Sequence, residues 1–145
     1  QNTDMLKKIL SISGKSGLFR LVSHGKNMII VESLKDKKRT PAYASNKIVA
    51  LGDISMYTYG EDIPLSQVFQ NVYDKYEGKA LNADDYTTAE QLAEFFEGVL
   101  PEYDKERVYK TDIKRVITWY NALIESGFTK FVEEEAEAAE AEESK

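Results

Sequence analysis

Cysteine is absent from this chain of 145 residues, and histidine and tryptophan each occur once. Without cysteine the chain has no disulfide, no thiolate nucleophile and no zinc–thiolate site. Its longest apolar stretches run for four or five residues, as at 28–31, whereas a membrane-spanning helix needs about 20. The polar start at 1–4 also lacks the features of a signal peptide. We therefore expect a cytoplasmic protein without a membrane span.

Charge is distributed unevenly along the chain. Residues 1–60 carry ten Lys and Arg against four Asp and Glu, and residues 61–145 carry nine against twenty-one. The overall net charge of −6 therefore conceals a basic first part and an acidic second part. We predict a basic N-terminal β domain at 5–60, an acidic helical domain at 61–132 and a disordered acidic tail at 133–145. The tail holds seven Glu and no large apolar group after Val132, which is typical of chain that cannot form a core.

The basic part has the pattern of short strands separated by turns. Strand candidates rich in apolar and β-branched residues lie at 18–22, 28–32, 40–44, 48–51 and 54–59. Pro41 places the third at a sheet edge, because proline cannot donate to a ladder. Five short strands in so few residues predict an α+β protein whose β unit is a small SH3-like barrel or a strongly bent antiparallel sheet. An open meander is the alternative.

The acidic part changes to helical spacing from Pro64 onward, and we expect a bundle of about three helices. The first should end near Gly78. Thr88 and Gln91 are spaced as a capping box for the second, which should stop before Pro101. Thr111 is the expected cap of the third, and Gly127 its left-handed terminus.

Several short motifs resemble one protein family. They are LKKILSISGKSGL at 6–18, VESL at 31–34, RTPA at 39–42, LGDIS at 51–55, DIKRVI at 112–117 and WYN at 119–121. These runs resemble a family of small uncharacterised bacterial proteins with an N-terminal β domain and a C-terminal helical domain, both of unknown function. The resemblance covers about residues 5–128 and implies the two-part layout, without an activity, cofactor or catalytic residue.

Signs of enzymatic chemistry are weak. The sequence Gly14-Lys15-Ser16 resembles the end of a phosphate-binding loop. That loop also needs a glycine at position 9, which is Ile9 in this chain, and a helix after it, whereas a strand candidate follows here. A turn between two strands accounts better for these residues. The lone His24 lies in a predicted loop with nothing to orient it as a base. We therefore predict no enzyme, and no catalytic, cofactor or metal residues.

The basic β unit suggests single-stranded RNA or DNA as a ligand. Candidate contacts are the cations at and near its turns, namely Arg20, Lys35, Lys37, Lys38, Arg39 and Lys47. Small barrels bind single strands by combining cations with aromatic stacking platforms. The acidic tail would then compete with the nucleic acid, although tails of this kind also serve solubility.

The leading functional hypothesis is a non-enzymatic protein-interaction or regulatory module, and nucleic-acid binding gated by the tail is the alternative. Trp and Tyr dominate interface hot spots, so we take Trp119, Tyr103 and Tyr109 as candidate interface residues for an unknown protein partner or a homodimer. For Trp119, packing between the two domains is the competing interpretation.

Overall fold

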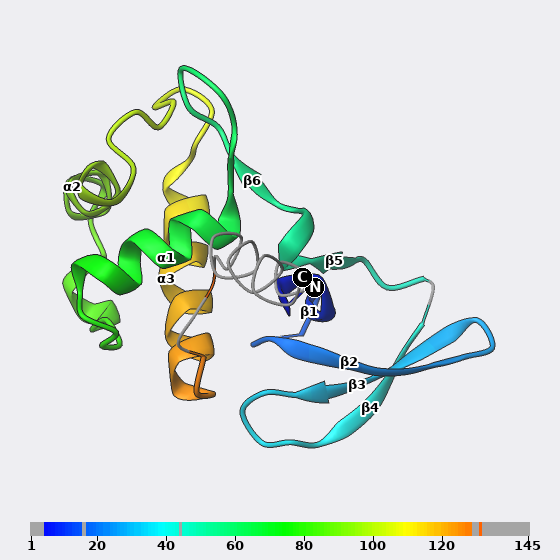
Figure 1. Ribbon diagram of the computed structural model, residues 1–145. Coiled ribbons are helices and arrows are strands. Elements are labelled where there is room, and N and C mark those ends of the chain that lie inside the picture. Colours follow the sequence, from blue (N-terminus) through cyan, green and yellow to red (C-terminus); the bar gives the residue numbers. More distant parts are fainter. Residues whose placement is uncertain (1–4, 16, 44, 129–130, 132–145) are drawn as a thin grey trace, which may run out of the picture.

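Five antiparallel strands and three α-helices make up the fold in the computed structural model, which describes residues 5–15, 17–43, 45–128 and 131 (Figure 1). The strands of the main sheet are β1 (Ile9–Ile12), β2 (Phe19–Gly25), β3 (Met28–Ser33), β4 (Arg39–Tyr43) and β5 (Ile48–Ala50). The helices are α1 (Leu65–Lys75), α2 (Ala89–Val99) and α3 (Lys110–Glu125). Short 3₁₀ turns are η1 (Met5–Lys8), η2 (Leu51–Asp53) and η3 (Ala83–Asp85), and a small hairpin pairs β6 (Ser55–Met56) with β7 (Ile63–Pro64). The predicted α+β class is confirmed.

The main sheet is open. Its order is β4-β3-β2-β1-β5, so β4 and β5 are the two edges and neither pairs with the other. An SH3-like barrel would need that closure, and the sheet therefore does not confirm the barrel expectation. Pro41 does lie on the edge strand β4, where its missing N–H costs no hydrogen bond within the sheet.

Membership of the sheet differs from the expected set of five strands. The 54–59 segment lies outside the main sheet, and the fifth strand is β1, which pairs with both β2 and β5. β1 was missed because its apolar run is short and follows two lysines. The predicted turn between two strands at Gly14 does join β1 to β2.

Both faces of the sheet carry apolar side chains, and they form two cores. Successive residues of a strand point to opposite faces, so Ile9 belongs to the large core with the helices while Leu10 and Ile12 belong to a second, smaller cluster. That cluster also holds Phe19, Val31 and Ala42 from β2, β3 and β4. The helices pack on the opposite face, with Ile9. A bulge between Leu21 and Ser23 increases the local twist.

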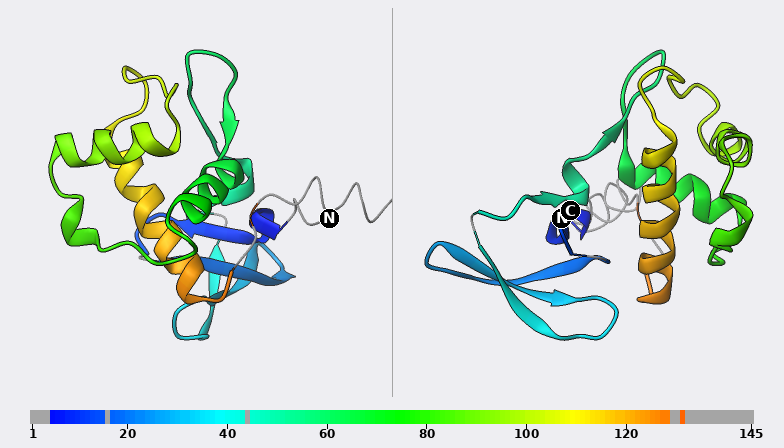
Figure 2. Two further views of the ribbon diagram at one scale, coloured as in Figure 1. Left: turned by 60° about the vertical axis from the view of Figure 1, so that its left-hand side comes forward. Right: turned by 180° about the vertical axis from the view of Figure 1, so that it is seen from behind.

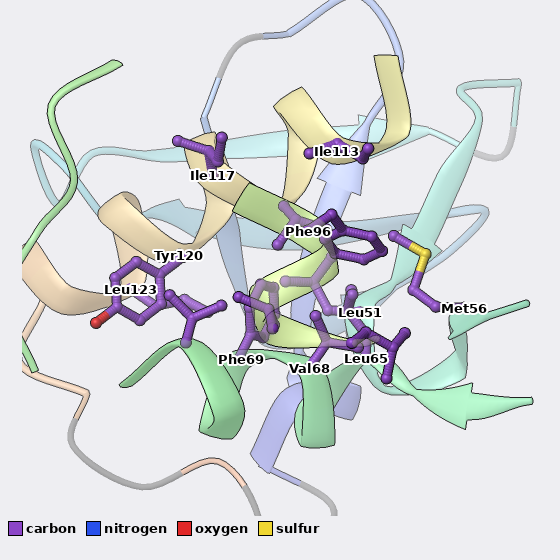
Figure 3. Packing of buried hydrophobic residues seen from close by; sticks show 14 of the residues in the cluster. Leu51, Met56, Leu65, Val68, Phe69, Phe96, Ile113, Ile117, Tyr120 and Leu123 are labelled. Atoms are coloured by element: carbon purple, nitrogen blue, oxygen red, sulfur yellow. The ribbon is translucent and has the colours of Figure 1, made fainter. Parts of the chain in front are cut away.

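The large core joins the sheet to the helices (Figure 3). Leu51 from η2 and Met56 from β6 lie beside Leu65 and Val68 of α1, and Phe96 of α2 fills the space between α1 and α3. Burying a Phe or Leu side chain stabilises a fold by about 1.5–3 kcal/mol. Figure 2 shows from two sides that the helices stand beside the sheet and that the β2–β3 hairpin projects away from them.

The helices begin largely as the sequence indicates. The Thr88 hydroxyl accepts from the backbone N–H of Gln91 at 3.1 Å, and the Gln91 side chain accepts from the backbone N–H of Thr88 at 3.0 Å, which confirms the capping box. Thr111, however, does not cap α3. The helix begins two residues earlier than that cap implies, with Tyr109 as its N-cap, and the Asp112 carboxylate accepts from the Tyr109 N–H at 2.9 Å. Gly127 has the expected left-handed backbone, with φ 94°.

Phe131 marks the far end of the core. It is buried and packs against Phe69, Tyr73, Tyr120 and Phe128. The predicted tail at 133–145 lies outside the described residues. Among the helices that the structure describes, none is both long and apolar enough to cross a membrane.

Two candidate binding surfaces

A basic hollow opens at the end of the curved sheet. It has a volume of about 690 Å³, and its lining includes Lys15, Lys35 and Lys38 together with Phe19 and Thr40. Phe19 belongs to the second cluster, so the hollow lies on the same face of the sheet as that cluster. The Thr40 hydroxyl is buried there without a hydrogen-bond partner among the described residues. Buried polar groups are seldom left unpaired, so this wall has hydrogen-bonding capacity that the fold itself does not use.

A tight turn between β3 and β4 holds two of these lysines. Lys37 takes a left-handed backbone, with φ 64°, and its N–H donates to the Ser33 carbonyl at 2.9 Å. The Asp36 carboxylate accepts from the Lys38 N–H at 3.0 Å. This hydrogen bond is the main cause of the lowered pKa of Asp36. Among the described residues, Asp36 is the one acid that lines the hollow. Lys35 and Lys38 therefore extend from a backbone fixed by hydrogen bonds.

A second hollow lies where the sheet meets α3. Its volume is about 440 Å³, and Lys15 and Lys47 line it together with Arg115 and Trp119 of α3. Lys15 lines both hollows, so the two are adjacent. We call the five cations Lys15, Lys35, Lys38, Lys47 and Arg115 the cationic tract. Arg115 pairs with Asp112 at 3.5 Å, with both groups partly in solvent, where such a pair contributes about 0–1 kcal/mol.

The two predicted arginines lie on the face of the sheet opposite Phe19 and Thr40 of the first hollow. Arg20 and Arg39 flank Glu32 in register, and their guanidinium groups lie 2.9 and 3.1 Å from its two carboxylate oxygens. These contacts, the hydrogen bond from Arg39 foremost, lower the pKa of Glu32. Both arginines are committed to this internal network. By contrast, Lys15, Lys35, Lys38 and Lys47 form no salt bridge with a described residue.

A tyrosine surface lies at the opposite end of the molecule. The segment 57–59 runs beside 102–104, with hydrogen bonds from the Tyr59 N–H to the Glu102 carbonyl and from the Asp104 N–H to the Tyr57 carbonyl. Tyr57 and Tyr59 point outward, 43% and 66% exposed, while Thr58 between them is buried. Figure 1 shows this loop after β6 meeting the loop before α3 at the top of the molecule.

Cations hold this surface in place. The Arg107 guanidinium stacks 4.4 Å from the centre of the Tyr57 ring and pairs with Asp104 at 2.8 Å. That pairing lowers the pKa of Asp104 and raises the pKa of Arg107. The Tyr59 hydroxyl accepts from the Lys105 N–H at 3.3 Å. Tyr109, two residues after Arg107, is 65% exposed. We call Tyr57, Tyr59, Arg107 and Tyr109 the tyrosine patch.

The three predicted interface residues occupy different environments. Tyr109 is exposed and belongs to the tyrosine patch. Tyr103 is 3% exposed and packs edge-on against Phe96, 5.0 Å between ring centres, so it is a core residue rather than a surface one. Trp119 is partly buried against the large core and lines the second hollow between the two parts of the chain.

Five members of these surfaces were not among the predicted site residues: Lys15, Tyr57, Tyr59, Arg107 and Arg115. Tyr57 and Tyr59 alternate with a threonine, and that pattern indicates inward tyrosines and an outward threonine, whereas the structure has the reverse. Arg115 lies on the predicted acidic helix, more than 60 residues from the basic turns, and only the packing of α3 on the sheet brings it to Lys47. Across the described ranges, no three His, Asp or Glu side chains gather in the way a metal site requires.

Comparison with known proteins finds two family models that match successive parts of the chain. A domain of unknown function, DUF5606, matches residues 6–51, and a second domain of unknown function, DUF6852, matches residues 54–123. A solution NMR structure of a protein from Bacteroides vulgatus, a structural-genomics target, is 50% identical. That match covers 89% of this chain and 92% of the other, with a TM-score of 0.74. No curated protein matches the chain. The chain belongs to the family of small proteins in which a DUF5606 domain precedes a DUF6852 domain.

Proposed function

We propose that the protein is a non-enzymatic, cytoplasmic interaction module that binds a partner protein through the tyrosine patch. The observation that supports this proposal is the exposure of Tyr57, Tyr59 and Tyr109, with Arg107 stacked on Tyr57 and Tyr109 two residues after that arginine. Tyr and Arg are the residue types enriched at the energetic centres of protein interfaces. A rigid tyrosine offers contact area at low entropic cost, and the Arg107 stack restricts the Tyr57 ring before any partner arrives.

The charge around the patch defines the partner. Two cations nearby are already paired, Arg107 with Asp104 and Lys105 with Glu97, while Lys110, next to Tyr109, forms no salt bridge with a described residue. Exposed acids surround them: Glu61, Glu102 and Glu106 form no salt bridge with a described residue. A basic segment with an apolar or aromatic side chain fits this setting, since its cations would meet the acids at the rim while its apolar group met the tyrosines.

A second copy of the chain fits the patch poorly. A symmetric dimer places the same surface opposite itself, so the acids at the rim would face one another and repel. The partner is therefore another protein rather than this chain, and the wild-type chain should not dimerise through the patch.

Arrays of random 12-residue peptides test this proposal without requiring the partner's identity. Labelled wild-type protein should select peptides with net positive charge and at least one aromatic or large aliphatic residue. The double variant Tyr59→Ser/Tyr109→Ser should lose that selection, because the contact area of both rings is gone. Thermal unfolding checks that the variant remains folded.

Tyr43 provides the matched control, because it is 52% exposed but lies on the edge strand β4, away from the patch. Tyr43→Ser should select the same peptides as the wild type. If Tyr59→Ser/Tyr109→Ser keeps the wild-type selection, or if the selected peptides are acidic, the proposal is wrong.

A further inference from the structure

We propose a second site, separate from the tyrosine patch: the cationic tract binds a single-stranded nucleic acid, with Trp119 as the contact for a base. The tract brings together cations from β-turns of the first part of the chain and from α3 of the second. The site therefore exists only when the two parts are packed together, which distinguishes it from the turn lysines taken alone.

The first support is the state of the cations. Lys15, Lys35, Lys38 and Lys47 lie exposed along two adjacent hollows and form no salt bridge with a described residue. Arg20 and Arg39, equally basic, instead pair with Glu32 on the sheet face opposite Phe19 and Thr40. Among the residues that the structure describes, Asp36 is the one acid that lines either hollow, and its carboxylate already accepts the Lys38 N–H. A concentration of cations of this kind attracts polyanions.

The second support is the shape of the site. One phosphate would be satisfied by a single hollow, but here Lys15 connects two hollows of about 690 and 440 Å³. An extended ligand with repeated negative charges fits both. Trp119 lines the second hollow and is partly exposed there. Single-strand binders combine cations that follow the backbone with aromatic rings that contact bases, and the tract has both.

An acidic segment of protein would match the cations but not the tryptophan. The chain's own tail, with seven Glu at 133–145, is such a segment, and it would compete with a nucleic acid for the tract. A test of the site therefore needs the full chain and a full-length chain whose seven tail Glu are changed to Gln, so that competition by the tail cannot hide the ligand.

The experiment measures binding of labelled 20-nucleotide oligo(dT) and oligo(U) by fluorescence anisotropy at several salt concentrations. The affinity should fall with salt at a slope of about −0.7 per phosphate contact, so four or five contacts predict a slope of about −3. Trp119 is the one tryptophan of the chain, and its emission should be quenched on binding because a base stacks on the indole. Polyglutamate of equal charge should bind without this quenching.

Charge-reversal variants locate the site. Lys15→Glu/Lys35→Glu/Lys47→Glu should weaken oligonucleotide binding by at least about tenfold, because three phosphate contacts become repulsive. A matched triple, Lys26→Glu/Lys79→Glu/Lys110→Glu, changes the net charge equally at exposed lysines that line neither hollow, and should weaken binding much less.

Three results would overturn the proposal. The first is the absence of binding at low salt by both the wild-type chain and the tail-neutralised chain. The second is an equal loss of affinity in the two triple variants, which would show that only net charge matters. The third is displacement of the oligonucleotide by polyglutamate at equal concentration with no quenching of Trp119, which would assign the tract to an acidic protein segment instead.

Discussion

Glu32 shows how a single side chain decides which cations remain available. It accepts from both Arg20 and Arg39 and is itself buried. In the sequence all cations of the β unit look equally available, because the charge of a residue does not show which side chain on a neighbouring strand it pairs with. Side chains along β2, β3 and β4 alternate between the two faces of the sheet, so neighbours in sequence such as Arg39 and Thr40 point to opposite faces. This alternation explains why both arginines meet Glu32.

Replacing Glu32 by Gln should make the stability of the protein depend less on pH. The folded-state pKa of Glu32 is lowered from 4.5 by its two arginines. The carboxylate therefore stabilises the fold fully above pH 4.5 and loses this effect as the pH falls through its folded-state pKa. Wild type should exceed Glu32→Gln in free energy of unfolding at neutral pH, and the difference should shrink on acidification.

Urea unfolding at a series of pH values measures this difference. Glu61→Gln removes an exposed carboxylate that forms no salt bridge with a described residue, and should change the unfolding free energy less at neutral pH. A Glu32→Gln deficit that stayed constant down to strongly acidic pH would contradict the assigned network.

At the scale of elements, the three helices and the strands β2 to β5 were predictable, whereas the pairing of the strands and the place of β1 in the sheet were not. Helix signals are local: the Thr88 and Gln91 pair, the apolar spacing and Gly127 all lie within a few residues of the features they specify. Pairing of strands is not local. β1 joins the sheet through contacts with β2 and β5, and β6 leaves it to pair with β7, and neither choice is visible in the strands themselves.

Thr88→Ala should lower the free energy of unfolding by about 1 kcal/mol, the usual cost of losing an N-cap side chain. The substitution removes the acceptor for the Gln91 N–H at the start of α2. Thr87→Ala is the natural control, because the Thr87 hydroxyl makes only a 3.3 Å contact with the Gln91 side chain. Denaturant unfolding compares the two, and an equal loss in both variants would argue against the capping role.

Viewed as a whole molecule, the chain has two family domains but one large core. Leu6, Ile9 and Leu51 come from the first domain and lie in the same cluster as the apolar residues of the three helices. The cationic tract is built across this junction. The two parts of the chain differ in composition, but their shared core, and hence the tract, depends on tertiary packing that no local pattern specifies.

Gly52 tests the packing of η1 against η2, the turn that brings Leu51 into the large core. A Cβ at this position would lie 2.5 Å from Cγ of Lys7 and 2.8 Å from its backbone nitrogen, so η1 would have to move away from η2. Gly52→Ala should therefore destabilise the protein by about 1–3 kcal/mol, as overpacking does. Gly60→Ala, where the nearest atom outside the adjacent residues is 3.9 Å away, should cost far less in the same thermal unfolding experiment. A Gly52→Ala variant as stable as the wild type would contradict this packing.

The most direct measurement of the proposed function is photo-crosslinking in living cells. A photoreactive benzoyl-phenylalanine replaces Tyr59, Tyr109 or, as control, Tyr43, one position at a time. We expect the same partner protein to be crosslinked from positions 59 and 109 and not from position 43. Crosslinks from position 43 alone, or from none of the three positions, would contradict the assignment of the tyrosine patch as the interface.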